Sequence, residues 1–214
     1  MASKDIDVAD AIGGLFCIAA LALLMWLVMS SAVAAPLAVC QKYRPILTRE
    51  AHFVQGLNAP IPMFAAQIEQ ESSCRAGITS FDGGKGLAQF TGGTIDGIGR
   101  LYPDLGPSQP YNPVWAIRAL VRYDTWLHAR VRGVDDCQRY AAALKGYNAG
   151  LGYSQQAQRL SRAPDIWFGM TEYVPTRQTP ANFEASRMYP RKVLLQRQPN
   201  YRGWGKYLCE GVRA

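Results

Sequence analysis

The sequence predicts a mostly α-helical domain that follows one apolar N-terminal helix. Beyond Cys40, apolar residues recur at helical spacing between prolines and glycines, and almost no stretch alternates as a strand would. Residues 11–35 form a run of 25 without a charged side chain. The whole chain has 214 residues, which is enough for one domain with a sizeable core and an appendage.

Composition and charge narrow the class of protein. With 49% hydrophobic and 18% charged residues, the chain is not disordered, collagen-like or a coiled coil. The net charge is +7, and because residues 1–10 hold one basic and three acidic groups, the remainder carries +9. A basic body favours an anionic polymer, either nucleic acid, a membrane surface or a wall polysaccharide. No basic helix or repeated aromatic platform is present, so we expect no nucleic-acid partner.

The apolar run is long enough to span a bilayer, which needs about 20 residues. Its acidic start and its length fit a secretory signal imperfectly. We therefore expect a short acidic N-terminus (1–10), a transmembrane or signal-anchor helix (11–35) and a folded domain (41–214). Cleavage after Ala32-Val33-Ala34 and a lipoprotein site at Cys40 remain alternatives. The domain would lie at the periplasmic face of the inner membrane or be released into the periplasm.

Cysteine usage agrees with an oxidising compartment. Four of the five cysteines, Cys40, Cys74, Cys137 and Cys209, follow the apolar run, and an even set predicts two disulfides. Because Cys40 and Cys209 flank the domain, we expect them to pair, and Cys74 to pair with Cys137. No C-x-x-C spacing occurs and only two histidines are present, so we expect no metal and no cofactor.

Caps and prolines predict where helices begin and end. We expect starts at Pro62, at Pro113 behind the Asn112 cap, after Asp135 or Asp136, at Pro180 and at Pro190, with one end at Gly150. The Gly-rich stretch 80–99 is too irregular for one long element.

The helix that starts near Pro62 carries the leading catalytic candidate, Glu71. Three apolar residues share its helical face: Ile61, Phe64 and Ile68. Burial on such a face raises the pKa of a carboxyl group, as a general acid near neutral pH requires. The alternative is that Glu71 lies at a frayed helix end and pairs with Arg75. Glu69 points elsewhere, and we expect it to be solvated.

Other polar residues could complete a site. Gln89 lies in an apolar setting and could hydrogen-bond a sugar. Asp82 or Asp96 could be the second carboxylate of a glycosidase, although a surface-loop role suits each of them too. Tyr147 and Asn148 precede a helix-ending glycine, which alone is weak evidence for a site.

These residues occur in the same order as the sequence motifs of one protein family. The chain resembles the soluble lytic transglycosylases, whose domain is lysozyme-like, at Glu71-Ser72, Gly86-Leu87-Ala88-Gln89, Gly146-Tyr147-Asn148-Ala149-Gly150 and Ser186–Leu194. The resemblance covers roughly Gln55 to Leu194. The chain departs from the family pattern at Ala88, Gly146, Ala185 and Pro190.

The resemblance implies an enzyme that cleaves the β-1,4 bond between N-acetylmuramic acid and N-acetylglucosamine in peptidoglycan. Glu71 would protonate the departing oxygen, and the substrate's N-acetyl group would stabilise the anomeric centre. Glu71 would then deprotonate the C6 hydroxyl and close a 1,6-anhydro ring. It further implies substrate-binding roles for Ser72, Gln89, Tyr147, Asn148 and Tyr189. The expected partners are glycan strands and, through residues 11–35, the inner membrane, with the protein acting as a monomer.

Three alternatives concern the biological setting and the reaction. The short body, the N-terminal segment and the loop at 80–90 are similar to phage endolysins that lyse the host. A goose-type lysozyme would share the fold and use Glu71 with Asp82 or Asp96 to activate water. A membrane-tethered wall-processing component of conjugation or virion assembly is the third. If the apolar segment leaves the membrane, Cys17 could attack a disulfide that includes Cys74.

Overall fold

The computed structural model describes residues 38–212. The expected acidic start (1–10), the apolar helix (11–35) and Cys17 lie outside these residues. Among residues 38–212, no helix has the length and apolar character needed to cross a membrane. The same residues contain helices and two isolated β-bridges but no strand, so the mostly helical fold class is confirmed.

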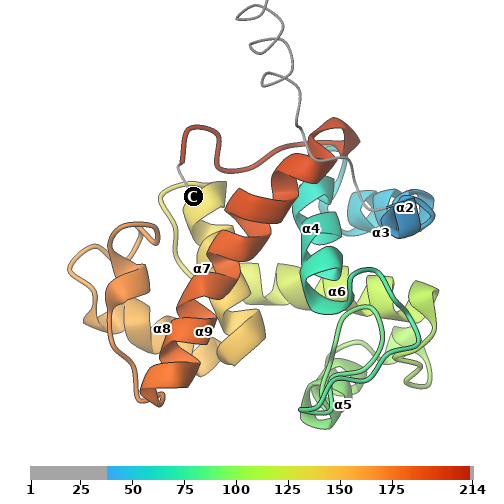
Figure 1. Ribbon diagram of the computed structural model, residues 1–214, viewed down its shortest axis with the longest axis horizontal. Coiled ribbons are helices and arrows are strands. Elements are labelled where there is room, and N and C mark those ends of the chain that lie inside the picture. Colours follow the sequence, from blue (N-terminus) through green and yellow to red (C-terminus); the bar gives the residue numbers. More distant parts are fainter. Residues whose placement is uncertain (1–37, 213–214) are drawn as a thin grey trace, which may run out of the picture. The chain divides into compact units, whose positions relative to one another are not determined.

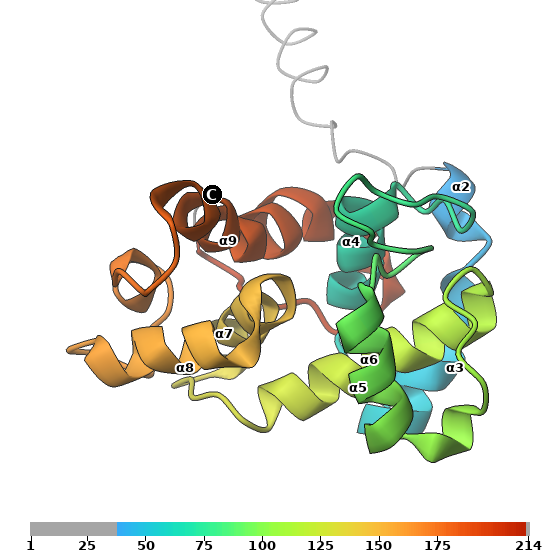
Figure 2. The same cartoon turned by 90° about the horizontal axis from the view of Figure 1, so that it is seen from below.

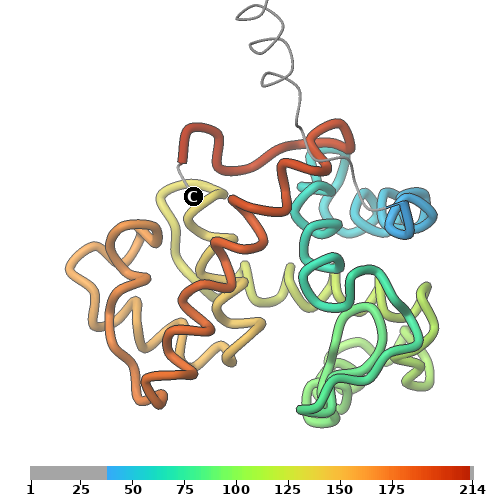
Figure 3. The backbone as a smooth tube through the Cα atoms, in the orientation of Figure 1, coloured from blue at the N-terminus to red at the C-terminus, as the bar shows by residue number. Residues whose placement is uncertain are grey.

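The helices follow one another closely along the chain (Figures 1 and 3). In order they are α2 (Ala38–Gln41), α3 (Arg44–Gln55), α4 (Ile61–Ser72), α5 (Gly92–Leu101), η1 (Pro103–Leu105), α6 (Pro113–His128), α7 (Asp136–Ala149), α8 (Leu151–Leu160), η2 (Thr171–Tyr173), α9 (Pro180–Arg191), η3 (Lys192–Arg197) and η4 (Gln198–Trp204). The short η elements are 3-10 helices, except that η3 is a π-helix.

Side-chain caps fix several helix starts where the sequence predicts them. The Asn112 side chain accepts a hydrogen bond from the Val114 N–H at 2.9 Å, so α6 starts at Pro113. Asp135 accepts from the Gln138 N–H at 2.8 Å and caps α7, which ends before Gly150. These bonds satisfy N–H groups that have no partner inside the helix.

One predicted helix start is wrong. Pro180 begins α9, but Pro190 lies inside that helix and starts none. Because proline cannot donate a backbone hydrogen bond, regular α-helix ends soon after it and continues as the π-helix η3. The Gly-rich stretch also contains a helix, α5, whose Ile95 and Ile98 are buried despite its four glycines.

The core forms around α4, α6 and α7. Helix α4 packs against α3, η3 and η4, whereas α7 packs against α6, α8 and α9. Figures 1 and 2 show α7 and α8 side by side, with α9 crossing α7. The buried Lys145 of α7 donates to Gln178 Oε1 at 2.8 Å and also to Ser186 of α9, so a polar contact ties these helices together.

Two disulfides join the ends of the described chain to its centre. The expectation of two disulfides among four cysteines is confirmed, but the expected pairing is wrong. Cys40 pairs with Cys74, because α2 lies beside the end of α4, with Cα atoms 5.2 Å apart. Cys137 pairs with Cys209, because the C-terminal segment returns to the start of α7, with Cα atoms 4.9 Å apart.

We predict that removing the Cys40–Cys74 bond with the double variant C40A/C74A lowers the free energy of unfolding by about 2–4 kcal/mol, because the unfolded chain regains the freedom of the closed loop. Denaturant unfolding measures this, with C137A/C209A as the comparison. Peptide mapping without reduction should recover Cys40 linked to Cys74, and a Cys40–Cys209 peptide would contradict this connectivity.

Candidate active site

A cavity of about 540 Å³ opens beside the end of α4. Its walls come from α4, the loop that follows it, α5, α6, the end of α7 and α9. Five of the six residues assigned to catalysis or substrate binding line it: Glu71, Gln89, Tyr147, Asn148 and Tyr189. The fold therefore brings together motifs that are more than a hundred residues apart in the chain.

Helix α4 presents Glu71 to this cavity from its last turn. Ile61, Phe64 and Ile68, on the same face, are fully buried, as the periodicity predicts. The chain then leaves the helix sharply, because Ser73 adopts a left-handed conformation with φ of 50°. Arg75 donates to the Ser72 carbonyl at 3.3 Å, and no ion pair joins it to Glu71. The frayed, Arg75-paired alternative is wrong.

The environment of Glu71 raises its pKa from the ordinary 4.5 to about 7. Burial against the core is the main cause, because it penalises the ionised carboxylate. The Tyr189 hydroxyl donates a hydrogen bond to Glu71 Oε1 and acts in the opposite direction. The negative charge of Asp82 raises the pKa a little further. Near neutral pH the group can therefore both give and accept a proton.

Aromatic rings form one wall of the cavity. The rings of Tyr147 and Tyr189 are stacked, with centroids 6.3 Å apart and planes 5° from parallel. Tyr147 also packs on Phe90 at 5.6 Å and donates its hydroxyl proton to the Ala88 carbonyl at 2.6 Å. Burial raises the pKa of both tyrosines well above 10, so their hydroxyls stay neutral donors.

The loop after α4 presents Gln89 to the cavity. Gln89 has a left-handed backbone with φ of 50°, and its amide nitrogen donates to the Gly86 carbonyl at 2.7 Å. Gly86 has φ of 67°, and a Cβ there would lie 1.9 Å from the Pro110 carbonyl oxygen, so only glycine fits. The side-chain oxygen of Gln89 accepts no hydrogen bond from the described residues, which leaves it for a ligand.

Ser72 does not line the cavity, and its predicted substrate-binding role stays a prediction. The side chain is buried and donates to the Ile68 carbonyl at 3.1 Å within α4. Of the two other carboxylates, Asp82 lines the cavity and Asp96 does not; Asp96 is exposed on α5. A hydrogen bond from Ser80 lowers the pKa of Asp82.

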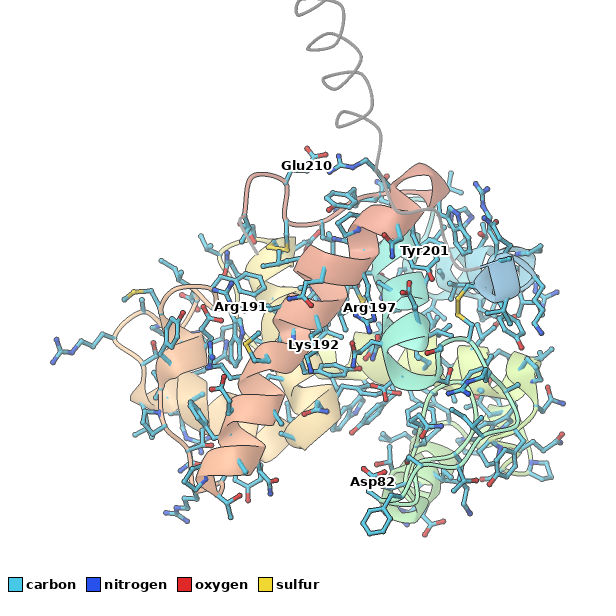
Figure 4. All side chains as sticks on the ribbon, in the orientation of Figure 1. Asp82, Arg191, Lys192, Arg197, Tyr201 and Glu210 are labelled. Atoms are coloured by element: carbon cyan, nitrogen blue, oxygen red, sulfur yellow. A yellow bond between two sulfur atoms is a disulfide. The ribbon has the colours of Figure 1, made fainter. Side chains whose placement is uncertain are left out.

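Glu69 is not solvated as expected. Its side chain is only 12% exposed and accepts a hydrogen bond from the Tyr201 hydroxyl at 2.7 Å. Arg197 lies 3.9 Å away and supplies a positive charge. Figure 4 shows Arg197 and Tyr201 on the C-terminal helical segment beside α4, so Glu69 fastens α4 to η3 and η4.

Asp124 is a buried carboxyl group near Glu71 that was not predicted from the sequence. Asp124 of α6 is 1% exposed, and its Oδ1 accepts a hydrogen bond from Gln67 of α4 at 3.4 Å. Burial raises its pKa well above the ordinary value, and the charge of Glu71 adds to this. A signal was available, because Asp124 falls three residues after Val121 and seven after Ile117 on the apolar face of its helix. Six further cavity residues had no predicted role: Gln70, Ser80, Phe90, Thr91, Thr94 and Tyr123.

The sequence around this site matches a known protein family. Residues 55–168, more than half of the chain, match the family described as the transglycosylase SLT domain. The chain belongs to this family. The matched SLT region contains Glu71, the cavity loop and α7, and it ends before α9, which supplies Tyr189.

Solved structures share the SLT fold. The 70-kDa soluble lytic transglycosylase in complex with bulgecin A is 20% identical, with a TM-score of 0.56 over 80% of this chain. The 70-kDa soluble lytic transglycosylase of Escherichia coli is 19% identical, with a TM-score of 0.54 over 77%. The match covers 25% of each of those longer chains. No curated protein matches the chain.

We predict that Tyr189→Phe raises the pKa of Glu71, because the lost hydrogen bond favours the ionised form. A general acid must be protonated, so the alkaline limb of the kcat/KM profile should move about one pH unit higher. Tyr147→Phe is the matched control, since its hydroxyl donates to a carbonyl instead. A limb that stays in place in Tyr189→Phe, or moves to lower pH, contradicts the assignment.

We also predict a pH-dependent stability difference for Glu71→Gln. Because the folded state raises the pKa of Glu71, it binds the proton more tightly than the unfolded chain does. This contribution is fully present below pH 4.5, and up to about 3 kcal/mol is lost as the pH rises to about 7. Thermal unfolding from pH 4 to 8 should show the variant gaining on the wild type as the pH rises. Parallel curves would contradict the raised pKa.

Proposed function

We propose that this protein is a peptidoglycan lytic transglycosylase in which Glu71 acts first as general acid and then as general base. The observation that carries the proposal is that Glu71, whose pKa is raised to about 7, lines a polar and aromatic cavity. Membership of the SLT family supports the substrate class.

The first step cleaves the glycosidic bond. Protonated Glu71 gives its proton to the oxygen between N-acetylmuramic acid and N-acetylglucosamine, and the bond electrons leave with that oxygen. The substrate's own N-acetyl oxygen stabilises the anomeric carbon, so a second protein carboxylate is not needed. The hydrogen bond from Tyr189 stabilises the Glu71 carboxylate that forms.

The second step closes the anhydro ring. The Glu71 carboxylate takes the proton of the C6 hydroxyl, and the oxygen attacks the anomeric carbon and displaces the N-acetyl oxygen. The product has a 1,6-anhydro end, and Glu71 is protonated again. We assign Gln89, Tyr147 and Asn148 to substrate binding, because they line the same cavity.

Glu71→Gln should abolish lysis of purified cell wall while the fold is retained, because glutamine keeps the shape and removes the proton. General acid–base catalysis contributes roughly 10²–10⁴-fold, so residual activity should be about 1% or less. Zymography measures lysis and circular dichroism the fold. A folded variant with higher activity would exclude Glu71 as the acid.

A goose-type hydrolase is the second candidate, because Asp82 lines the cavity with Glu71. Mass spectrometry of the released muropeptides separates the two, since an anhydro end is lighter than a reducing end by one water. We expect anhydro ends from the wild type and from Asp82→Asn. Reducing ends that disappear in Asp82→Asn would establish the hydrolase instead.

The setting that we propose is the periplasm, with residues 11–35 as a transmembrane or signal-anchor helix and the catalytic domain at 41–214. The uncharged run of 25 residues and the four disulfide-bonded cysteines support it. The biological role that we propose for this wall-cleaving enzyme is lysis of the host cell by a phage. Membrane fractionation of the full chain, with and without residues 11–35, tests the anchor.

A further inference from the structure

A second cavity of about 480 Å³ adjoins the catalytic one. The two cavities share Ala149, the last residue of α7, and Gly150, which links α7 to α8. Neither residue places a side chain larger than a methyl group at this junction. The two cavities therefore adjoin at small residues.

Helix α8 and the loop before α9 build the second cavity. Tyr153, Gln156 and Arg159 come from α8, and Arg177 comes from the loop. The Gln156 side-chain oxygen accepts a hydrogen bond from the Arg177 backbone N–H at 3.2 Å, which holds the loop to the helix. Buried Ser154 donates to the Ala142 carbonyl of α7 at 2.6 Å and fixes α8 in place.

The charge in this cavity is positive and not neutralised. Within the described part of the chain, neither Arg159 nor Arg177 has a carboxylate within 4.0 Å, and no acidic residue lines the cavity. Three other arginines in the described part of the chain do have carboxylate partners: Arg132 with Asp165, Arg187 with Glu184 and Arg191 with Glu172. A guanidinium fork suits a carboxylate ligand.

We propose that this second cavity is a subsite for the carboxylates of the peptide that peptidoglycan carries on its muramic acid residues. The inference rests on the proposed function, which places the glycan in the adjoining cavity. The glycan is uncharged once its lactyl groups are linked to peptides, so the negative charge of the strand lies on those peptides. Arg159 and Arg177 line the cavity next to the glycan path, and Tyr153 offers an aromatic surface to the peptide.

The test compares the double variant R159Q/R177Q with the wild type on two substrates. One is glycan strands that carry peptides, and the other is strands from which an amidase has removed the peptides. We expect kcat/KM on peptide-bearing strands to fall about five- to tenfold, as for the loss of two exposed charge pairs. On peptide-free strands it should change less than about twofold.

Arg162→Gln is the matched control. Arg162 is exposed and of the same charge, but it lines neither cavity. An equal loss in this control would mean general charge attraction and overturn the subsite. So would no loss in the double variant, or an equal loss on both substrates.

Binding separates this inference from the proposed function. In the Glu71→Gln background, which does not consume the strands, fluorescence polarisation should show that R159Q/R177Q weakens binding only to peptide-bearing strands. If the wild type releases no anhydro ends from either kind of strand, the proposed function fails, and the binding comparison still decides for or against the peptide subsite.

Discussion

The hydrogen bond from Tyr189 to Glu71 connects two helices that are far apart in the sequence, at the candidate active site. Glu71 is on α4 and Tyr189 is on α9, 118 residues later. The bond forms only if α9 packs on α7 and continues through η3 onto α4, since these contacts place the tyrosine over the carboxyl group. The hydrogen bond also lowers the pKa of Glu71 and so offsets part of the increase that burial causes. The packing of α9, the proton affinity of Glu71 and the tyrosine wall of the cavity therefore all involve this one hydrogen bond.

Helix positions could be predicted from the sequence because caps and apolar periodicity act within a few residues. Asn112 and Asp135 work in this way, and the face of α4 identified Glu71. Pro190 starts no new helix, because the buried packing of Tyr189 and Val193 keeps the segment helical from α9 into η3. Disulfide connectivity depends on which chain ends meet in space, which no local pattern records.

The candidate site was predictable only in part for a similar reason. Periodicity flags a carboxyl group on an apolar face, and the rule applies to Asp124 as well as to Glu71. The rule does not say which of the two faces a cavity. Asp124 is enclosed with Gln67 between α4 and α6, whereas Glu71 lies at the helix end beside open space. Accessibility separates the two groups, and it arises from tertiary packing.

The two carboxyl groups of the cavity have opposite environments, and this bears on the reaction. Burial raises the pKa of Glu71 to about 7, whereas the Ser80 hydrogen bond lowers the pKa of exposed Asp82. A carboxylate with a lowered pKa is a weak base, so it activates water poorly. Its negative charge, however, helps to keep Glu71 protonated. Asp82 is therefore better suited to support a single acid–base group than to serve as a second one, which favours ring closure by the substrate's own hydroxyl over attack by water.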